Sequence, residues 1–137
     1  MTGLLHSTDV ASIEQQAADA KAFFERELAW HQELGTFPVE TFQVFCDPRT
    51  YITLDNSFDL VLRVDVAVTG SAIVSDKGEK LPVAEVCENL CQKLKVLWGV
   101  QYPDHLPVVA SLYLDRGKGA LWQLFSLLNP ECLELTD

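Results

Sequence analysis

The stretch FDLVLRVDVAV, residues 58–68, decides the fold of this 137-residue chain. Its even-numbered residues are all apolar, whereas Asp59, Arg63 and Asp65 occupy odd positions. Successive side chains of a β-strand point to opposite faces of a sheet. The alternation therefore predicts a strand with one face in a hydrophobic core and the other toward water, where Arg63 and its acidic neighbours form an ordinary solvated charge ladder.

Turn-forming residues divide the chain before this strand. Asp47-Pro48-Arg49 and Asp55-Asn56-Ser57 bound two shorter β-like segments, residues 41–46 and 50–54. Proline, asparagine and aspartate at such places are typical of tight turns. The pattern predicts an antiparallel meander of three strands, followed by a short strand at residues 72–75.

A long helix precedes the predicted meander. Residues 9–34 repeat apolar side chains every three or four positions, Asp9 or Ser12 can cap the start, and Gly35 suits the end. At about 1.5 Å per residue this helix is about 40 Å long, longer than a domain of this size readily covers. We expect part of it to project or to pack against a second copy of the chain.

The second half of the chain predicts another helix, one more strand and a short last helix. Pro82 suits a first helical turn and Gly99 a helix end, and the predicted core face between them consists of Val83, Val86, Cys87, Leu90, Leu94 and Leu97. Residues 108–114 predict a strand and residues 120–128 a short helix. The predicted fold class is thus α+β, in one domain over residues 1–137, with flexible ends at 1–8 and 131–137.

Charge and composition exclude several classes of function. Twenty acidic residues against ten basic ones give a net charge of −10, with no basic stripe to neutralise phosphates. Nucleic acid and membranes are therefore not expected partners, although charge alone leaves an acidic mimic of DNA open. The first residues lack the features of a signal peptide and no apolar stretch is long enough to span a bilayer, so we expect a cytoplasmic protein.

Residues that carry chemistry are few and scattered. Cys87 and Cys91 lie one helical turn apart, but two thiols are half a zinc site, and core packing of reduced cysteines is the simpler reading, also for Cys46 and Cys132. The three histidines (His6, His31 and His105) have no evident nucleophile, and Gly117-Lys118-Gly119 lacks the spacing of a phosphate-binding loop. We therefore assign no catalytic residue, no metal ligand and no cofactor.

One short string resembles a known signature. YPDHLP, residues 102–107, resembles the YPxxxP motif of ubiquitin-conjugating-like and RWD domains, and without a suitably placed cysteine the resemblance implies a noncatalytic protein-interaction module. The order of the predicted elements is also similar to that of the small dimeric chaperones of secretion systems. That similarity is one of fold only and implies a chaperone-like or adaptor-like role.

The expected function is that of a non-enzymatic protein-binding or accessory module. Aromatic side chains are enriched at interfaces, so the candidate partner surface consists of Trp30, Trp98, Tyr102, His105 and Trp122. A homodimer through the N-terminal helix is a further expectation. The alternative is a small-ligand-binding protein or small enzyme, with a pocket between sheet and helices that converges on His105, Tyr113 or Cys46.

Overall fold

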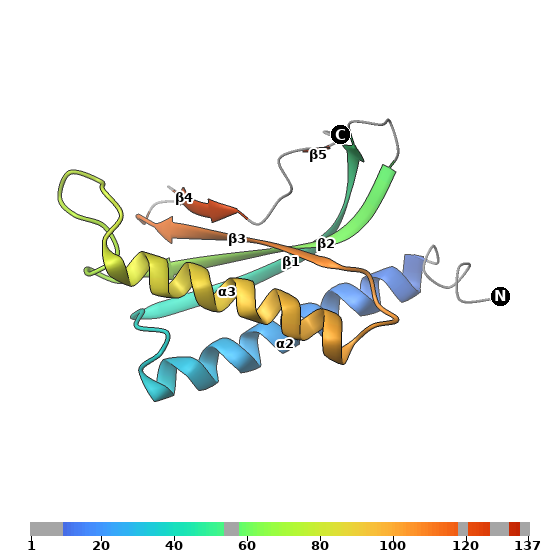
Figure 1. Cartoon of the computed structure of the whole chain (residues 1–137), viewed down its shortest axis with the longest axis horizontal. Coiled ribbons are helices and arrows are strands. Elements are labelled where there is room, and N and C mark those ends of the chain that lie inside the picture. The colour runs from blue at the N-terminus through green and yellow to red at the C-terminus, as the bar shows by residue number, and fades with distance from the viewer. Residues whose placement is uncertain (1–9, 54–57, 118–120, 127–131, 135–137) are drawn as a thin grey trace.

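Two helices lie on the same face of a mixed, five-stranded sheet (Figure 1). The computed structural model describes residues 10–53, 58–117, 121–126 and 132–134. The elements follow in the order α2 (Val10–Leu34), β1 (Thr41–Thr53), β2 (Phe58–Thr69), α3 (Pro82–Gln101), β3 (Val108–Asp115), β4 (Leu121–Ser126) and β5 (Cys132–Glu134). The strands lie side by side as β4-β3-β2-β1-β5, so the α+β class is confirmed.

The central strand β2 has the predicted two faces. Leu62, Val64, Val66 and Val68 are completely buried against the helices. The opposite face is less open to water than its charges predict, because the odd-numbered residues Val61 and Ala67 are buried too, while Arg63 and Asp65 are half-buried. Arg63 bonds the carboxylate of Asp65 at 3.2 Å and the hydroxyl oxygen of Tyr113 at 2.9 Å.

The predicted meander is wrong in its number of strands and in its pairing. Residues 41–53 form one continuous strand that pairs with β2 through Pro48, opposite Leu62. Proline has no N–H to donate to a neighbouring strand. β5 pairs with β1 only at Tyr51–Thr53, so no described strand lies beside Pro48 on that edge of β1 to accept such a hydrogen bond. β3 then pairs with β2 in parallel, because the chain crosses over through α3 between them.

No strand forms at residues 72–75. Val74 makes a single bridge with Lys80 around the turn at Gly78, whose φ of 81° suits glycine. The Ser75 hydroxyl oxygen accepts hydrogen bonds from the backbone N–H groups of Lys77 and Glu79. These bonds satisfy the turn locally, so the segment does not join the sheet.

Residues 121–126 and 132–134 form strands, where we predicted a helix at 120–128 and a flexible end at 131–137; the other residues of these two ranges lie outside the described part of the chain. Residues 121–126 pair with β3 in antiparallel fashion, and residues 132–134 pair with β1. The sequence LWQLFS suits either structure by its apolar spacing, and β4 is favoured because it supplies hydrogen bonds along the free edge of β3. The predicted flexible end at residues 1–8 lies outside the described residues.

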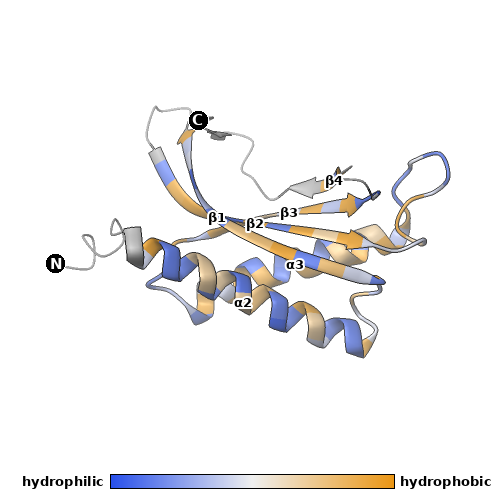
Figure 2. Cartoon of the chain, turned by 180° about the vertical axis from the view of Figure 1, so that it is seen from behind, coloured by the Kyte–Doolittle hydropathy of each residue, from blue (hydrophilic) through white to orange (hydrophobic). Residues whose placement is uncertain are grey.

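The helices match the predicted positions, with one change of face. α2 has the predicted length, while α3 continues through Gly99 to Gln101. Its core face consists of Ala84, Cys87, Leu90, Cys91, Leu94 and Trp98, whereas Val86, which we predicted to be buried, is exposed. Figure 2 shows apolar residues along the strands above the helices and hydrophilic residues along α2.

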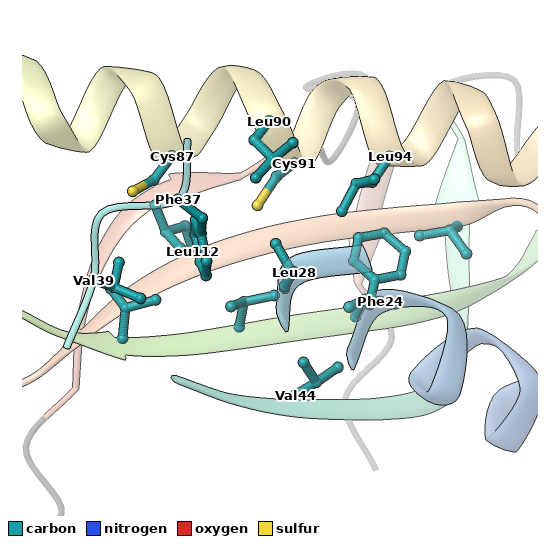
Figure 3. Close-up of a cluster of buried hydrophobic side chains, with 14 of the residues drawn as sticks. Phe24, Leu28, Phe37, Val39, Val44, Cys87, Leu90, Cys91, Leu94 and Leu112 are labelled. Atoms are coloured by element: carbon teal, nitrogen blue, oxygen red, sulfur yellow. The ribbon is translucent and has the colours of Figure 1, made fainter. Parts of the chain in front are cut away.

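One hydrophobic core joins both helices to the sheet. In Figure 3, Phe24 and Leu28 of α2, Leu90 and Leu94 of α3, and Leu112 of β3 point toward one another. Phe37, from the connection between α2 and β1, fills the space beneath α3 and is completely buried. The inward face of each helix is therefore occupied by core contacts, and the outward face is the one exposed to solvent.

Candidate functional site

The two helices are joined tightly at one end by aromatic side chains. Phe23 of α2 contacts Trp98 and Tyr102 of α3 edge to face, with ring centroids 5.5 and 6.0 Å apart. Tyr102 stacks on Trp98 at 4.3 Å. Such pairs add to the free energy of burial, so this end of the helix pair is closed.

The proline-containing loop after α3 secures the same end. The indole N–H of Trp98 donates to the carbonyl of Leu106 at 3.0 Å, and the Leu106 N–H donates to the side-chain oxygen of Gln16 at 2.7 Å. His105 lies against both aromatic rings, with its Nε2 3.6 Å from a carboxylate oxygen of Asp19. The YPDHLP string thus follows a helix, not a strand as in the families it resembles, and its contacts hold α2, α3 and the loop together.

Beyond these contacts, a groove of about 590 Å³ lies between α2 and α3. We define the helix groove by its lining residues: Glu27, His31, Thr36, Val86, Asn89, Leu90, Lys93, Leu94 and Leu97. Leu90 and Leu94, whose side chains belong to the core, form its floor. The groove is therefore a shallow extension of the core to the surface.

The end of α2 shapes this groove. The carbonyl oxygen of His31 accepts hydrogen bonds from the N–H groups of Thr36 and Phe37, at 2.9 and 3.1 Å. The His31 ring nitrogen Nδ1 lies 2.7 Å from the Thr36 hydroxyl oxygen. Gly35, with a φ of 83°, permits this reversal. His31 and Thr36 are thus fixed in the groove wall while Phe37 turns inward.

Both helices carry exposed apolar side chains, of which Val86 lines the groove itself. Their exposed fractions are 57% for Trp30, 56% for Leu34, 45% for Val86, 66% for Val96 and 69% for Val100. A second depression of about 640 Å³ follows α3 along Gln92, Val96 and Val100, and shares Asn89, Lys93 and Leu97 with the helix groove. We call Val86, Asn89, Lys93, Val96 and Val100 the outer α3 stripe.

The two walls of the groove carry opposite charges. Glu27 lies on the α2 side and Lys93 on the α3 side. Residues 89–101 of α3 contain two lysines and no acidic residue, although the whole chain has a net charge of −10. This half of α3 is therefore locally basic on an acidic protein.

The predicted surface residues do not form one surface. Trp30 is exposed on α2, one residue before His31 of the groove lining, whereas Trp98, Tyr102 and His105 form the closed end, where Trp98 is only 1% exposed. Trp122 lies on β4, with the Arg116 guanidinium 4.0 Å above its ring and Gly78 beneath it. The sequence-based prediction did not include Val96 and Val100, whose signal is that Val96 lies three residues after Lys93 and Val100 four residues after Val96.

The groups named for an alternative active site do not converge. His105 lies at the closed end of the helix pair, Tyr113 bonds Arg63 on the sheet face away from the helices, and Cys46 lies in β1. Burial, with Asp47 and Asp65 nearby, raises the pKa of Cys46 to about 12. Burial likewise raises the pKa of Cys91 to about 12 and that of Cys87 to about 11. Thiols held in this protonated form are poor nucleophiles.

Among the residues that the structure describes, no three histidine, cysteine, aspartate or glutamate side chains lie close enough to hold a metal ion. None of the helices in the described ranges is both long and apolar enough to cross a membrane.

Comparison with known proteins gives no family. No family model matches the chain, and neither a curated protein nor a solved structure resembles it significantly. Function must therefore be argued from the groove and its surroundings.

Proposed function

We propose that this chain is a non-enzymatic protein-binding module, an adaptor or accessory protein that binds another polypeptide on its helix layer. One observation carries the proposal: the two helices expose five apolar side chains, Trp30, Leu34, Val86, Val96 and Val100. Val86 lines the helix groove, whose floor is continuous with the core, and Val96 and Val100 line the depression that shares residues with it. Soluble proteins rarely leave large apolar surfaces in contact with water unless a partner covers them.

The composition of the surface favours a helical occupant. Its walls are side chains of two helices, and the inner backbone groups of a helix bond within that helix. An extended peptide buried there would therefore leave its own N–H and C=O groups without partners, which costs about 1–3 kcal/mol for each group. A helix brings its backbone bonds with it and offers only side chains.

A small apolar ligand is the second candidate. The groove volume of about 590 Å³ lies within the range of known ligand sites. A ligand would use the floor at Leu90 and Leu94 and leave the outer α3 stripe exposed. Substitutions at Val96 and Val100 therefore separate the two candidates, because they affect a polypeptide partner and not a ligand in the groove.

The test is affinity capture of the tagged full chain from the extract of its native cell, followed by mass spectrometry. Three baits are compared: the wild type, the V96E/V100E double variant, and L121E as a matched control. Leu121 is 49% exposed, like the others, but lies on β4 away from the helix groove.

The proposal expects a stoichiometric polypeptide that the wild type and L121E retain and V96E/V100E loses. The captured polypeptide is then identified and its binding repeated with purified components. Equal recovery by all three baits, or recovery of no polypeptide, overturns the proposal.

A further inference from the structure

α3 presents two stripes with the same helical spacing: an apolar inner seam, and the outer α3 stripe, in which Val86, Val96 and Val100 accompany Asn89 and Lys93. The inner seam of Ala84, Cys87, Cys91, Leu94 and Trp98 advances by three and four residues alternately and is buried in the core. The outer α3 stripe has the same spacing, displaced by two residues, and ends in the exposed Val96 and Val100. Alternation of three and four is the spacing at which two helices pack along their length. The outer α3 stripe is thus suited to a second helix.

The charges around this stripe specify what that helix carries. Lys93 lies in its middle, in the half of α3 that contains no acidic residue. The Lys93 ammonium needs a carboxylate opposite it once water is excluded, because an unpaired buried charge is strongly destabilising. The fitting occupant is therefore a helix with apolar residues one turn apart and an acidic residue beside them.

The second half of α2 has these properties. Trp30 and Leu34 are four residues apart and more than half exposed. Glu27 lies one turn before them, and Glu33 adds a further negative charge. The same helix layer thus carries both an occupant and a site for it, which is the requirement for a symmetric interface between two identical chains.

The geometry of the helix pair allows both contacts at once. α2 and α3 run in opposite directions, and Glu27 and Lys93 line the same groove. A two-fold axis through the groove at that level places α2 of one copy on α3 of the other. Both helices rise about 1.5 Å per residue. Trp30 lies three residues after Glu27, and Val96 lies three residues after Lys93, so Trp30 of one copy falls opposite Val96 of the other. Leu34 falls opposite Val100 in the same way.

We infer that the occupant of the helix layer is a second copy of this chain. Trp30 and Leu34 of each copy pack on Val96 and Val100 of the other, and each Lys93 pairs with Glu27 of the other copy. The inference rests on the proposed function, since it names the partner for the same surface. Both charge pairs form near the symmetry axis, where the interface excludes water best.

A charge exchange between two variants tests this arrangement. K93E alone places two carboxylates opposite each other, and E27K alone places two ammonium groups opposite each other. We expect each variant by itself to associate about 10-fold or more weakly than the wild type, as charge-pair energies of 1.4 kcal/mol or more imply. In an equimolar mixture every pair is complementary again, so heterodimers of K93E with E27K should dominate a native mass spectrum.

Sedimentation equilibrium of the wild type, V96E/V100E and L121E completes the test. The wild type and L121E should dimerise, and V96E/V100E should dimerise at least about 100-fold more weakly, because two charges enter an apolar contact. Circular dichroism checks that each variant is folded. A monomeric wild type, a dimer unaffected by V96E/V100E, or mixed variants that form no heterodimer overturns the inference.

These results are distinguishable from failure of the proposed function. A monomeric wild type that still captures a different polypeptide, in a manner lost in V96E/V100E, overturns only the inference about the second copy. A wild type that neither dimerises nor captures any polypeptide through Val96 and Val100 overturns both.

Discussion

Gln16 shows how a single polar residue can hold two distant segments together. Gln16 is only 7% exposed and lies on the core side of α2. Its side-chain oxygen accepts a hydrogen bond from the N–H of Leu106, ninety residues later in the chain. That bond fixes the loop at Leu106, and the carbonyl oxygen of Leu106 accepts a hydrogen bond from the indole N–H of Trp98. Gln16 thereby helps to keep the closed end of the helix pair closed.

We predict that Gln16→Ala lowers the free energy of unfolding by about 1–3 kcal/mol, because it removes the acceptor for a largely enclosed backbone N–H. Urea denaturation measures the loss, and hydrogen exchange should show faster exchange at the Leu106 amide. Gln15→Ala is the matched control, since the bond between Gln15 and Asp19 is exposed, and it should cost less than about 0.5 kcal/mol. Equal effects of the two substitutions would contradict this role.

The buried thiols predict how stability changes at alkaline pH. Burial raises the pKa of Cys91 to about 12 from its ordinary value of 9.0, so the unfolded chain loses this proton at lower pH than the native protein. The native state then binds more protons, and its stability falls as pH rises from about 9 toward 12. Cys87 acts in the same direction, with a pKa raised to about 11.

In Cys91→Ala, the decline in unfolding free energy above pH 9 should be shallower by up to about 1.4 kcal/mol per pH unit, the contribution of one proton. The variant is also less stable at neutral pH because it leaves a cavity, so the slope and not the absolute value is compared. Urea titrations at a series of pH values measure it. Identical slopes in wild type and variant would show that this thiol does not stay protonated in the native state.

At the scale of elements, α3 illustrates the difference between a glycine that ends a helix and one that does not. Gly99 lies within α3, and a Cβ added there would meet nothing within 4 Å. Gly35 also has open space around it, but its φ of 83° follows the end of α2. Only the second glycine is required by the backbone.

We predict opposite effects for the same substitution at these two positions. Gly99→Ala should raise the free energy of unfolding by about 0.5–1 kcal/mol, because alanine favours the helix and restricts the unfolded chain. Gly35→Ala should lower it by about 1 kcal/mol or more, since an L side chain is strained at positive φ. The midpoints of urea denaturation give both values. Destabilisation by Gly99→Ala would mean that α3 does not continue through this residue.

Sequence patterns predicted the elements best where one periodicity extended over many residues. α2, β2, α3 and β3 were predicted at nearly their observed bounds, because each repeats apolar side chains over seven residues or more. Pro48 misled because its turn-forming tendency is local, whereas its place in β1 depends on pairing with Leu62 of β2. The segment at 121–126 was assigned to a helix because pairing with β3 is a tertiary contact that six residues cannot reveal.

The candidate site was predictable only in part. Trp30 was expected at a partner surface and is exposed one residue before His31 of the helix groove. The groove itself depends on how α2 and α3 are placed relative to each other, which includes the contacts of Phe23 with Trp98 and Tyr102 and cannot be read from the spacing within either helix. Val86 was misplaced because it lies four residues before the buried Leu90 and three before Asn89 of the outer α3 stripe, and only the position of the sheet decides which face of α3 is buried.

At the scale of the whole molecule, net charge opposes the compact state. Like charges that sum to −10 repel one another in the native protein more than in the expanded unfolded chain. The ion pairs at Arg26–Glu27 and Lys80–Glu88 are partly exposed and contribute little against this repulsion. Salt should therefore stabilise the protein rather than weaken it.

We predict that sodium chloride, raising the ionic strength from about 0.01 M to 0.15 M, raises the melting temperature by a few degrees, which corresponds to about 1 kcal/mol in the free energy of unfolding. The reason is that the Debye length falls from about 30 Å to about 8 Å, so the repulsion is screened. Glu14 and Glu25 are both exposed on α2 and do not line the helix groove. The E14Q/E25Q variant therefore makes the net charge less negative with little other change. It should melt higher than the wild type at low salt and respond less to added salt. Differential scanning calorimetry at one fixed protein concentration measures both, since association also raises the melting temperature. A melting temperature that falls with salt would mean that specific ion pairs, and not overall repulsion, dominate the electrostatics of this fold.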